Sequence, residues 1–207
     1  MKKKMNEGNT VRKNRLTVIL IILIFIAPLA GSWLLLNYTD MLEKHGTSNH
    51  GDLIIPPRPL PDIKLIDPLS ETNTGQLQGK WSMLYIADSE CDQMCIANLY
   101  RMRQVRLATG KHYQRVQRVL LMQQGDVYRL AQIFRDYSGQ WLMVTENINL
   151  QEFLDYFRFE KGENPARKHR LYIIDPLGNL MMRYSPDTDP IGIIKDLNRL
   201  LRASRIG

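Results

Sequence analysis

The sequence predicts an α/β domain, a buried sheet covered by helices on both faces, preceded by one N-terminal transmembrane helix. Three observations lead to this prediction. Residues 16–36 form a long, uncharged and mostly apolar stretch near the N-terminus. Residues 81–87 form a short apolar run that is typical of a strand buried on both faces, and a helical pattern follows it. Beyond it, short apolar runs alternate with amphipathic stretches, which is the pattern of a layered α/β domain.

The stretch from Leu16 to Leu36 has 21 residues, enough to cross the core of a bilayer at about 1.5 Å per residue. Residues 1–15 carry six lysines and arginines against one glutamate. Because basic flanks stay in the cytoplasm, we expect a cytoplasmic head, a single span in the inner (plasma) membrane and, in a Gram-negative host, a periplasmic C-terminal domain. An uncleaved anchor is favoured over a signal peptide, since Pro28 occupies a position where cleavage requires a small side chain.

The formal net charge of +7 does not indicate nucleic-acid binding, because residues 40–207 keep only +2 of it. We therefore expect no nucleic-acid partner, and no phosphate-binding loop points to a small-molecule substrate. One segment, residues 101–118, is locally basic. It is either a solvated helix face or a face for anionic lipid head groups or an acidic partner.

Residues 37–60 are expected to form a tether between the anchor and a domain that covers residues 61–207. Glycine, serine and asparagine gather in the middle of the tether and prolines at its end, so a flexible piece precedes a stiff extended one. His45 and His50 lie in this tether, and we expect both to be solvated and not to be ligands.

Hydrophobic periodicity and turn residues predict the elements of the domain. Gly110 is a natural cap for the end of the helix that follows the cysteines. Asp189 and Pro190 suit the N-cap and the first residue of the last helix. The expected strands are residues 63–66, 81–87, 116–122, 141–144, 171–174 and 180–184; the expected helices run from the cysteines to about 109 and over 126–137, 150–157 and 189–203. This order of strands and helices is that of a thioredoxin-like three-layer fold.

The two cysteines of the chain, Cys91 and Cys95, stand four residues apart where the strand 81–87 gives way to a helix. Thioredoxin-like proteins deliver two thiols to a helix N-terminus in this way, and the helix dipole there favours the thiolate. At ideal helical spacing the two Cβ atoms are about 5–6 Å apart, too wide for an unstrained disulfide. The pair is therefore expected to chelate a soft ion such as Cu(I), or to close into a disulfide if the loop leaves helical geometry. The alternative is two separate thiols that pack as small hydrophobes.

Two sulfurs leave a metal shell incomplete, so a third ligand is sought among the histidines and methionines. His169 precedes the strand 171–174 and is expected to lie near the cysteine loop, unless it is a surface residue of the basic stretch 167–170. His112 and Met94 are weaker candidates. Three acidic residues surround the thiols, opposing the thiolate but attracting a cation: Asp88, Glu90 and Asp92.

From Leu60 onward the chain resembles the Sco/SenC family. The resemblance lies in Leu60-Pro-Asp-Ile-Lys-Leu, Leu77-Gln-Gly-Lys-Trp81, Cys91-x-x-x-Cys95 and Tyr172-Ile-Ile-Asp-Pro-Leu-Gly178. It implies a membrane-anchored, thioredoxin-fold copper protein that assembles the binuclear copper centre of cytochrome c oxidase. The expected partners are then a cytochrome c oxidase subunit or its assembly factors, and the implied metal ligands are Cys91, Cys95 and His169.

Three departures from the family pattern mark a divergent member. Asp92 and Ile96 follow the cysteines where the family has proline. The aspartate-rich stretch after the third strand is reduced to Gln123-Gln-Gly-Asp126. The position of the family's histidine is held by Arg167, and His169 lies two residues later, on the same strand face but displaced by about 6–7 Å.

Three functions remain open on this evidence. In the first, Cys91, Cys95 and His169 bind Cu(I) and pass it to an oxidase subunit. In the second, the chain is a thiol-disulfide oxidoreductase, in oxidase biogenesis or as a generic periplasmic enzyme, in which Cys91 attacks and Cys95 resolves. In the third, it is a non-catalytic scaffold of an oxidase-assembly complex. Whether the chain is an enzyme is thus left open.

Overall fold

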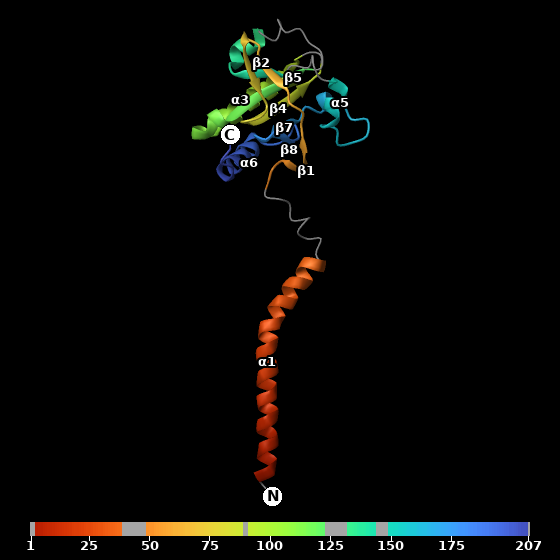
Figure 1. Cartoon of the computed structure of the whole chain (residues 1–207), viewed down its shortest axis with the longest axis vertical. Helices are drawn as coiled ribbons and strands as arrows, with labels where there is room; N and C mark the ends of the chain where they lie inside the picture. Colours follow the sequence, from red (N-terminus) through yellow and green to blue (C-terminus); the bar gives the residue numbers. More distant parts are fainter. Residues whose placement is uncertain (1–2, 39–48, 89–90, 123–131, 144–148, 207) are drawn as a thin grey trace. The chain divides into compact units, whose positions relative to one another are not determined.

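The computed structural model describes residues 3–38, 49–88, 91–122, 132–143 and 149–206. The chain divides into two compact units, Met1–Ser48 and Asn49–Gly207. The first unit contains one helix, α1 (Lys3–Tyr38, Figure 1). Within it, Asn14–Leu34 is long and apolar enough to cross a membrane, and its side chains are exposed. The helix extends beyond both ends of the span expected from the sequence.

The second unit is built on one eight-stranded mixed sheet with the order β1-β8-β7-β4-β5-β6-β2-β3. Strands β4, β5 and β6 run parallel, and every other neighbouring pair is antiparallel. β4 lies at the centre, and each of its seven residues is buried, as the apolar run predicted. The strands are β1 (Asp52–Pro59), β2 (Lys64–Asp67), β3 (Ser70–Gln76), β4 (Trp81–Ala87), β5 (Val116–Met122), β6 (Gln140–Met143), β7 (Leu171–Ile174) and β8 (Asn179–Tyr184).

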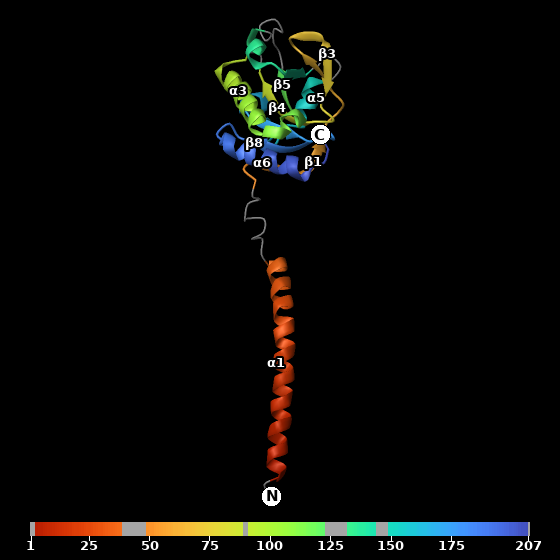
Figure 2. The same ribbon diagram turned by 90° about the vertical axis from the view of Figure 1, so that its left-hand side faces the viewer.

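Helices cover both faces of this sheet, as Figures 1 and 2 show. Trp81, Met83 and Tyr85 of β4 pack towards α3 (Gln93–Ala108) and α6 (Pro190–Ala203). The alternate residues Leu84 and Ile86 pack towards α5 (Leu150–Asp155). The period of two along a strand thus divides the core into two layers, one on each side of the sheet. The described part of the unit also contains three short 3₁₀ helices: η1 (Gly110–Arg115), η2 (Arg135–Tyr137) and η3 (Pro165–Lys168).

The helix starts follow local capping rules. Asp189 Oδ1 accepts a hydrogen bond from the N–H of Ile191, and Pro190 is the first residue of α6, as predicted. Asn149 caps α5 in the same way. The first half of the predicted helix 126–137 lies outside the described residues; the second half, from residue 132, is helical, and Phe134 is buried as predicted.

Two strands differ from the sequence prediction. The proline-rich end of the expected tether forms β1, which pairs with β8 at the edge of the sheet, where prolines are tolerated because one row of N–H groups is not needed. Its ladder is interrupted between Leu53 and Arg58. The polar segment Ser70–Gln76 forms β3 by pairing with β2. Neither segment has strand periodicity of its own, so each becomes a strand because it pairs with a neighbouring strand.

A buried carboxylate on α6 holds the start of β1. Asp196 is 1% exposed, and its Oδ2 accepts hydrogen bonds from the N–H groups of His50 (2.7 Å) and Gly51 (3.0 Å) and from the Tyr184 hydroxyl (3.3 Å). His50 Nδ1 lies 3.1 Å from Asp196 Oδ1. His50 is exposed, as expected, but its backbone and ring are also hydrogen-bonded to Asp196, which the sequence did not predict. His45 lies outside the described residues.

We expect Asp196→Ala to lower the free energy of unfolding by about 3 kcal/mol, because two backbone N–H groups and a hydroxyl lose their buried acceptor. Urea unfolding of the full chain in neutral detergent, followed by tryptophan fluorescence, measures the change. Asp187→Ala is the control, since Asp187 is exposed. Equal unfolding midpoints for the two variants would contradict this account.

Candidate functional site

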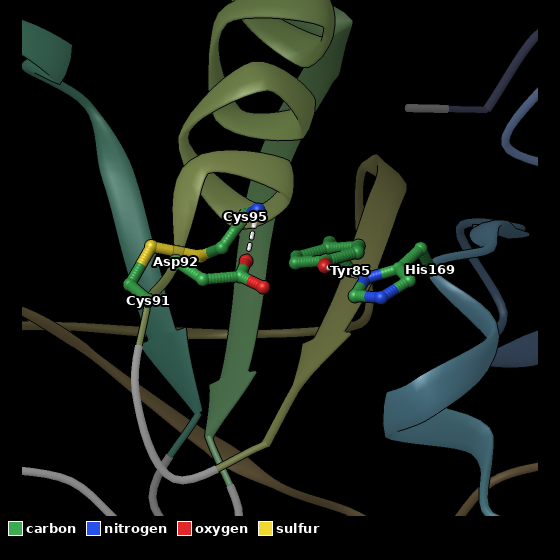
Figure 3. Close-up of a disulfide and its surroundings, with 5 residues drawn as sticks. All are labelled: Tyr85, Cys91, Asp92, Cys95 and His169. Atoms are coloured by element: carbon green, nitrogen blue, oxygen red, sulfur yellow. Dashed lines mark hydrogen bonds between the residues drawn. A yellow bond between two sulfur atoms is a disulfide. The ribbon is translucent and has the colours of Figure 1, made fainter.

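The cysteine pair lies where β4 ends and α3 begins. Cys91 precedes the N-cap residue Asp92, and Cys95 lies in the first turn of α3. A disulfide joins Cys91 to Cys95, with their Cα atoms 5.0 Å apart (Figure 3). The ideal helical spacing assumed from the sequence does not apply, because Asp92 is extended and Cys91 therefore lies outside the helix. The two sulfurs meet, and the alternative of two separately packed thiols does not describe this structure.

Asp92 brings a negative charge to the helix start beside the sulfurs. Its Oδ1 accepts a hydrogen bond of 2.9 Å from the N–H of Cys95, and its carbonyl accepts one from the N–H of Ile96. This is an N-cap, stabilised by the helix dipole. The negative charge of the carboxylate opposes the dipole's preference for a thiolate at this end of the helix.

The two sulfurs differ in access. Cys95 is 1% exposed and packs in the core layer that contains Leu99 and Tyr85, whereas Cys91 is half-buried at the edge of that layer. A sulfur of another protein can therefore reach Cys91 but not Cys95. This is the order of access that an attacking and a resolving cysteine require.

His169 contacts a tyrosine of the central strand and not the disulfide. Its Nδ1 lies 2.8 Å from the Tyr85 hydroxyl, and the two rings stack with centroids 6.5 Å apart. In Figure 3 the Tyr85 ring lies between His169 and the sulfurs. His169 is the C-cap of η3 in a left-handed conformation, with φ of 49°, so it precedes β7 and is not part of it.

Burial raises the pKa of Tyr85 to about 12; a hydrogen bond from Asn98 acts against this rise, and the charge of Asp92 adds to it. The phenol therefore stays protonated at neutral pH. The contact with the Tyr85 hydroxyl takes up Nδ1 of His169, so Nε2 is the ring nitrogen that remains for a ligand role.

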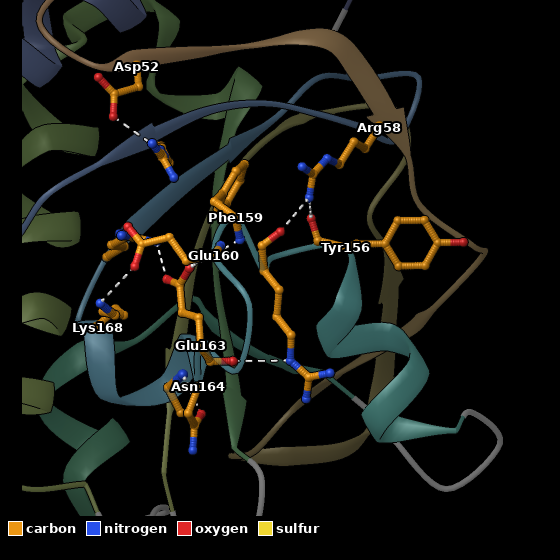
Figure 4. Close-up of polar contacts among 12 residues, drawn as sticks. Asp52, Arg58, Tyr156, Phe159, Glu160, Glu163, Asn164 and Lys168 are labelled. Carbon is orange, nitrogen blue, oxygen red and sulfur yellow. Dashed lines mark hydrogen bonds and ion pairs between the residues drawn. The ribbon is translucent and has the colours of Figure 1, made fainter.

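A polar loop around Glu163 and Asn164, shown in Figure 4, leads into η3, and His169 caps the end of η3. Glu163 is 6% exposed; its Oε2 accepts from the N–H groups of Phe159 and Glu160, both at 3.1 Å, and its Oε1 pairs with Arg170. Asn164 then caps η3 by accepting from the N–H of Ala166. These bonds hold the backbone on both sides of η3, and with it the ring of His169.

The other residues considered as ligands, or as charges near the thiols, do not gather into one site. Met94 is 43% exposed on the first turn of α3, and His112 is half-buried on η1. Asp88 pairs with Arg167 across 3.3 Å, and Glu90 lies outside the described residues. Within the described part of the chain, no group of three or more His, Cys, Asp or Glu side chains is arranged to hold a metal ion.

The donor set still suits a soft ion once the disulfide is reduced. Two thiolates and an imidazole are ligands for Cu(I) or zinc, but a disulfide supplies no thiolate. The disulfide must therefore open before a metal can bind here, and His169 would offer Nε2 while Tyr85 holds its Nδ1.

Sequence reasoning missed the hydrogen-bond partner of His169, which is Tyr85. A signal was present, because a buried tyrosine hydroxyl within an otherwise apolar strand normally needs a hydrogen-bond partner. Which histidine supplies it depends on how η3 packs, and this is not visible in the pattern of residues.

The fold and this cysteine pair define a thioredoxin-like domain that follows a membrane-span candidate. Residues 81–204 match the family model described as transmembrane-like, thioredoxin-like, C-terminal domain, and the chain belongs to that family. A comparison with curated proteins found no match.

Several solved structures with the same fold are Sco1/SenC proteins, which confirms the resemblance at the level of the fold. Copper-bound yeast Sco1 is 15% identical with a TM-score of 0.56, and the match covers 72% of this chain and 95% of that one. A SCO1/SenC family lipoprotein from Bacillus anthracis is 19% identical with a TM-score of 0.54, covering 70% and 97%. BsSco, a Sco-family cytochrome c oxidase assembly protein with an identified disulfide switch, is 12% identical with a TM-score of 0.54, covering 72% and 96%.

We expect the stability of the domain to fall as the pH rises from about 10 to about 12. Burial raises the pKa of Tyr85 and of Tyr172 to about 12 in the folded chain. The phenol of an unfolded chain has a pKa of about 10. The contribution of each tyrosine to the free energy of unfolding is therefore complete below pH 10 and falls by up to about 2–3 kcal/mol by pH 12. Urea unfolding over this pH range measures the slope. Tyr85→Phe should remove the contribution of Tyr85 to this slope, and an unchanged slope in that variant would contradict the raised pKa of Tyr85.

Proposed function

We propose that this chain is a membrane-tethered, Sco-like reductant that acts in cytochrome c oxidase biogenesis. It keeps the copper-ligand cysteines of an oxidase subunit in the thiol state by reducing the disulfide between them. The observation that carries the proposal is the Cys91–Cys95 disulfide at the β4–α3 junction, with one accessible and one buried sulfur. The disulfide switch identified in BsSco, a protein of the same fold, supports a redox role for this pair. The apolar segment Asn14–Leu34 would anchor the chain in the inner membrane with the domain in the periplasm.

The reaction is a two-electron exchange. The Cys91 thiolate of the reduced protein attacks one sulfur of the target disulfide; a mixed disulfide forms and the first target thiolate leaves. Cys95, deprotonated, then attacks the Cys91 sulfur, the second target thiolate leaves, and the Cys91–Cys95 disulfide closes. The target gains two electrons and takes up two protons from solvent, and an external dithiol must reduce Cys91–Cys95 for the next cycle.

Copper delivery is the second candidate, favoured by the copper-bound structures of yeast Sco1 and of the Bradyrhizobium japonicum and Arabidopsis thaliana proteins with this fold. Here Cu(I) would be cargo, held by Cys91 and Cys95 as thiolates and by Nε2 of His169. Tyr85 would keep the imidazole oriented from the opposite nitrogen, as supporting partners of metal-bound histidines do. A generic oxidoreductase and a scaffold remain outcomes of the tests below.

We expect Cys95→Ser to trap a mixed disulfide with the target and Cys91→Ser to trap none, because only Cys91 is accessible for attack. The full chain is incubated with an oxidase subunit whose copper-ligand cysteines are joined in a disulfide. Non-reducing gels then measure the adduct. Treatment with dithiothreitol must release it. Adducts of equal yield with both variants would contradict the assigned roles, and oxidase assembly supported in cells by the double serine variant would leave only the scaffold.

For the copper candidate, we expect the reduced chain to bind Cu(I) one to one and His169→Ala to weaken binding at least about tenfold, the loss typical for a missing ligand or its partner. Competition with a chromogenic Cu(I) chelator measures the affinity. His112→Ala is the matched control, since His112 lies on η1. Equal affinities for the His169 and His112 variants would remove His169 from the site.

A further inference from the structure

A stripe of exposed side chains runs along α3 from the turn that carries the disulfide. Ile96, Tyr100 and Leu107 are 39%, 53% and 52% exposed, and Arg103 lies exposed among them. Spacings of four, three and four residues bring these side chains to one face of the helix, over a length of about 16 Å. The opposite face, with Leu99, packs on the sheet, so within the described domain the stripe has no covering element.

Beyond the N-cap residue Asp92, the charged residues of α3 and of the segment after it are all positive. Residues 93–125 contain six lysines and arginines and no aspartate or glutamate. Arg101 and Arg106 donate to the backbone carbonyls of Pro186 and Val116, which do not neutralise their charge. Within the described residues, the exposed side chains of Arg103 and Lys111 form no hydrogen bond or ion pair.

A buried arginine beneath α3 adds to this positive field. Arg118 of β5 is 1% exposed; only its Nη2 has partners, the carbonyls of Ser138 and Tyr137 at 2.5 and 3.4 Å. Burial lowers the pKa of Arg118 to about 10, and the charges of Arg106 and Arg103 contribute to this lowering. The guanidinium is still charged at neutral pH, so a carboxylate placed on the stripe would meet an uncompensated positive field.

We propose that Ile96, Tyr100, Arg103 and Leu107 form the docking surface for the protein whose disulfide Cys91 reduces, and that this partner presents an acidic segment with apolar side chains. The proposal rests on the proposed function. Ile96 directly follows Cys95, so a segment lying on the stripe brings its neighbouring sulfur to Cys91. A protein fits this position better than a membrane, because a lipid surface over the stripe would also cover the turn through which Cys91 must be reached.

Two peptides test the proposal. They share one disulfide loop and the same apolar residues, but glutamates flank the loop in one and lysines in the other. The reduced full chain in neutral detergent should reduce the acidic peptide about tenfold faster at low salt, and this advantage should collapse at high salt, as electrostatic steering does.

Variants then locate the surface. Arg103→Glu should lower the rate with the acidic peptide at least about threefold, and Tyr100→Ser with Leu107→Ser should slow both peptides. Lys161→Glu is the charge-matched control, since Lys161 is exposed in the loop before η3. Every variant should reduce hydroxyethyl disulfide at the parent rate, which shows that the cysteine pair is intact.

The outcomes separate docking from chemistry. Failure to reduce hydroxyethyl disulfide overturns the proposed function. Docking is judged independently, by binding of the same peptides with alanine for cysteine to the oxidised chain. Equal binding of the two peptides, unaffected by Arg103→Glu, overturns the docking proposal. The face belongs to the membrane if the two peptides bind equally and hydrogen exchange in α3 is slower in nanodiscs of anionic lipid but not of neutral lipid. That result also overturns the docking proposal.

Discussion

The chemistry of this protein depends on the residue at which α3 begins. The Asp92 side chain accepts the N–H of Cys95, so the helix starts at Gln93 and Cys91 stays outside it in an extended approach. One helical turn earlier, both cysteines would lie on the helix with Cβ atoms about 5–6 Å apart, beyond the reach of a relaxed disulfide. The cap therefore brings the two sulfurs close enough to form the disulfide, and it places a carboxylate beside them.

The central strand connects this junction to the rest of the domain. β4 is buried on both faces, and its period of two sends Tyr85 to the same layer as Cys95. Tyr85 then holds His169 at Nδ1, and the loop around Glu163 holds the backbone that carries His169. The imidazole is thus oriented by the sheet in the oxidised state, independently of any metal, which is compatible with a redox role and with a ligand role after reduction.

The surface beyond the sulfurs has a different origin. The docking surface of Ile96, Tyr100, Arg103 and Leu107 lies on the exposed face of α3, whereas the buried residues of that helix pack in the core. The exposed stripe adds nothing to the core, and like charges gathered above the buried Arg118 disfavour the folded chain. Features that cost stability and lie next to a reactive pair are best understood as recognition of a partner.

Much of this organisation could be predicted from the sequence. The apolar segment near the N-terminus, the buried run 81–87, the cap of α6 at Asp189 and Pro190 and the thioredoxin-like order of elements all follow from local periodicity and capping chemistry, which need no distant contact. The position of the cysteines between a strand and a helix was equally visible. The structure agrees with each of these features, because local preference and tertiary packing point the same way.

Other features could not be predicted, because they depend on pairing between distant segments. The proline-rich residues of β1 become a strand only because β8 lies beside them, and His50 is held only because Asp196 of α6 is buried next to it. Tyr85 meets His169 across 84 residues of chain. The sequence by itself determined the candidate membrane span, the fold class and the cysteine pair. Tertiary structure alone decided which sulfur is accessible, which residue orients the histidine and which face of α3 is left open, because burial and long-range hydrogen bonds exist only once the sheet has formed.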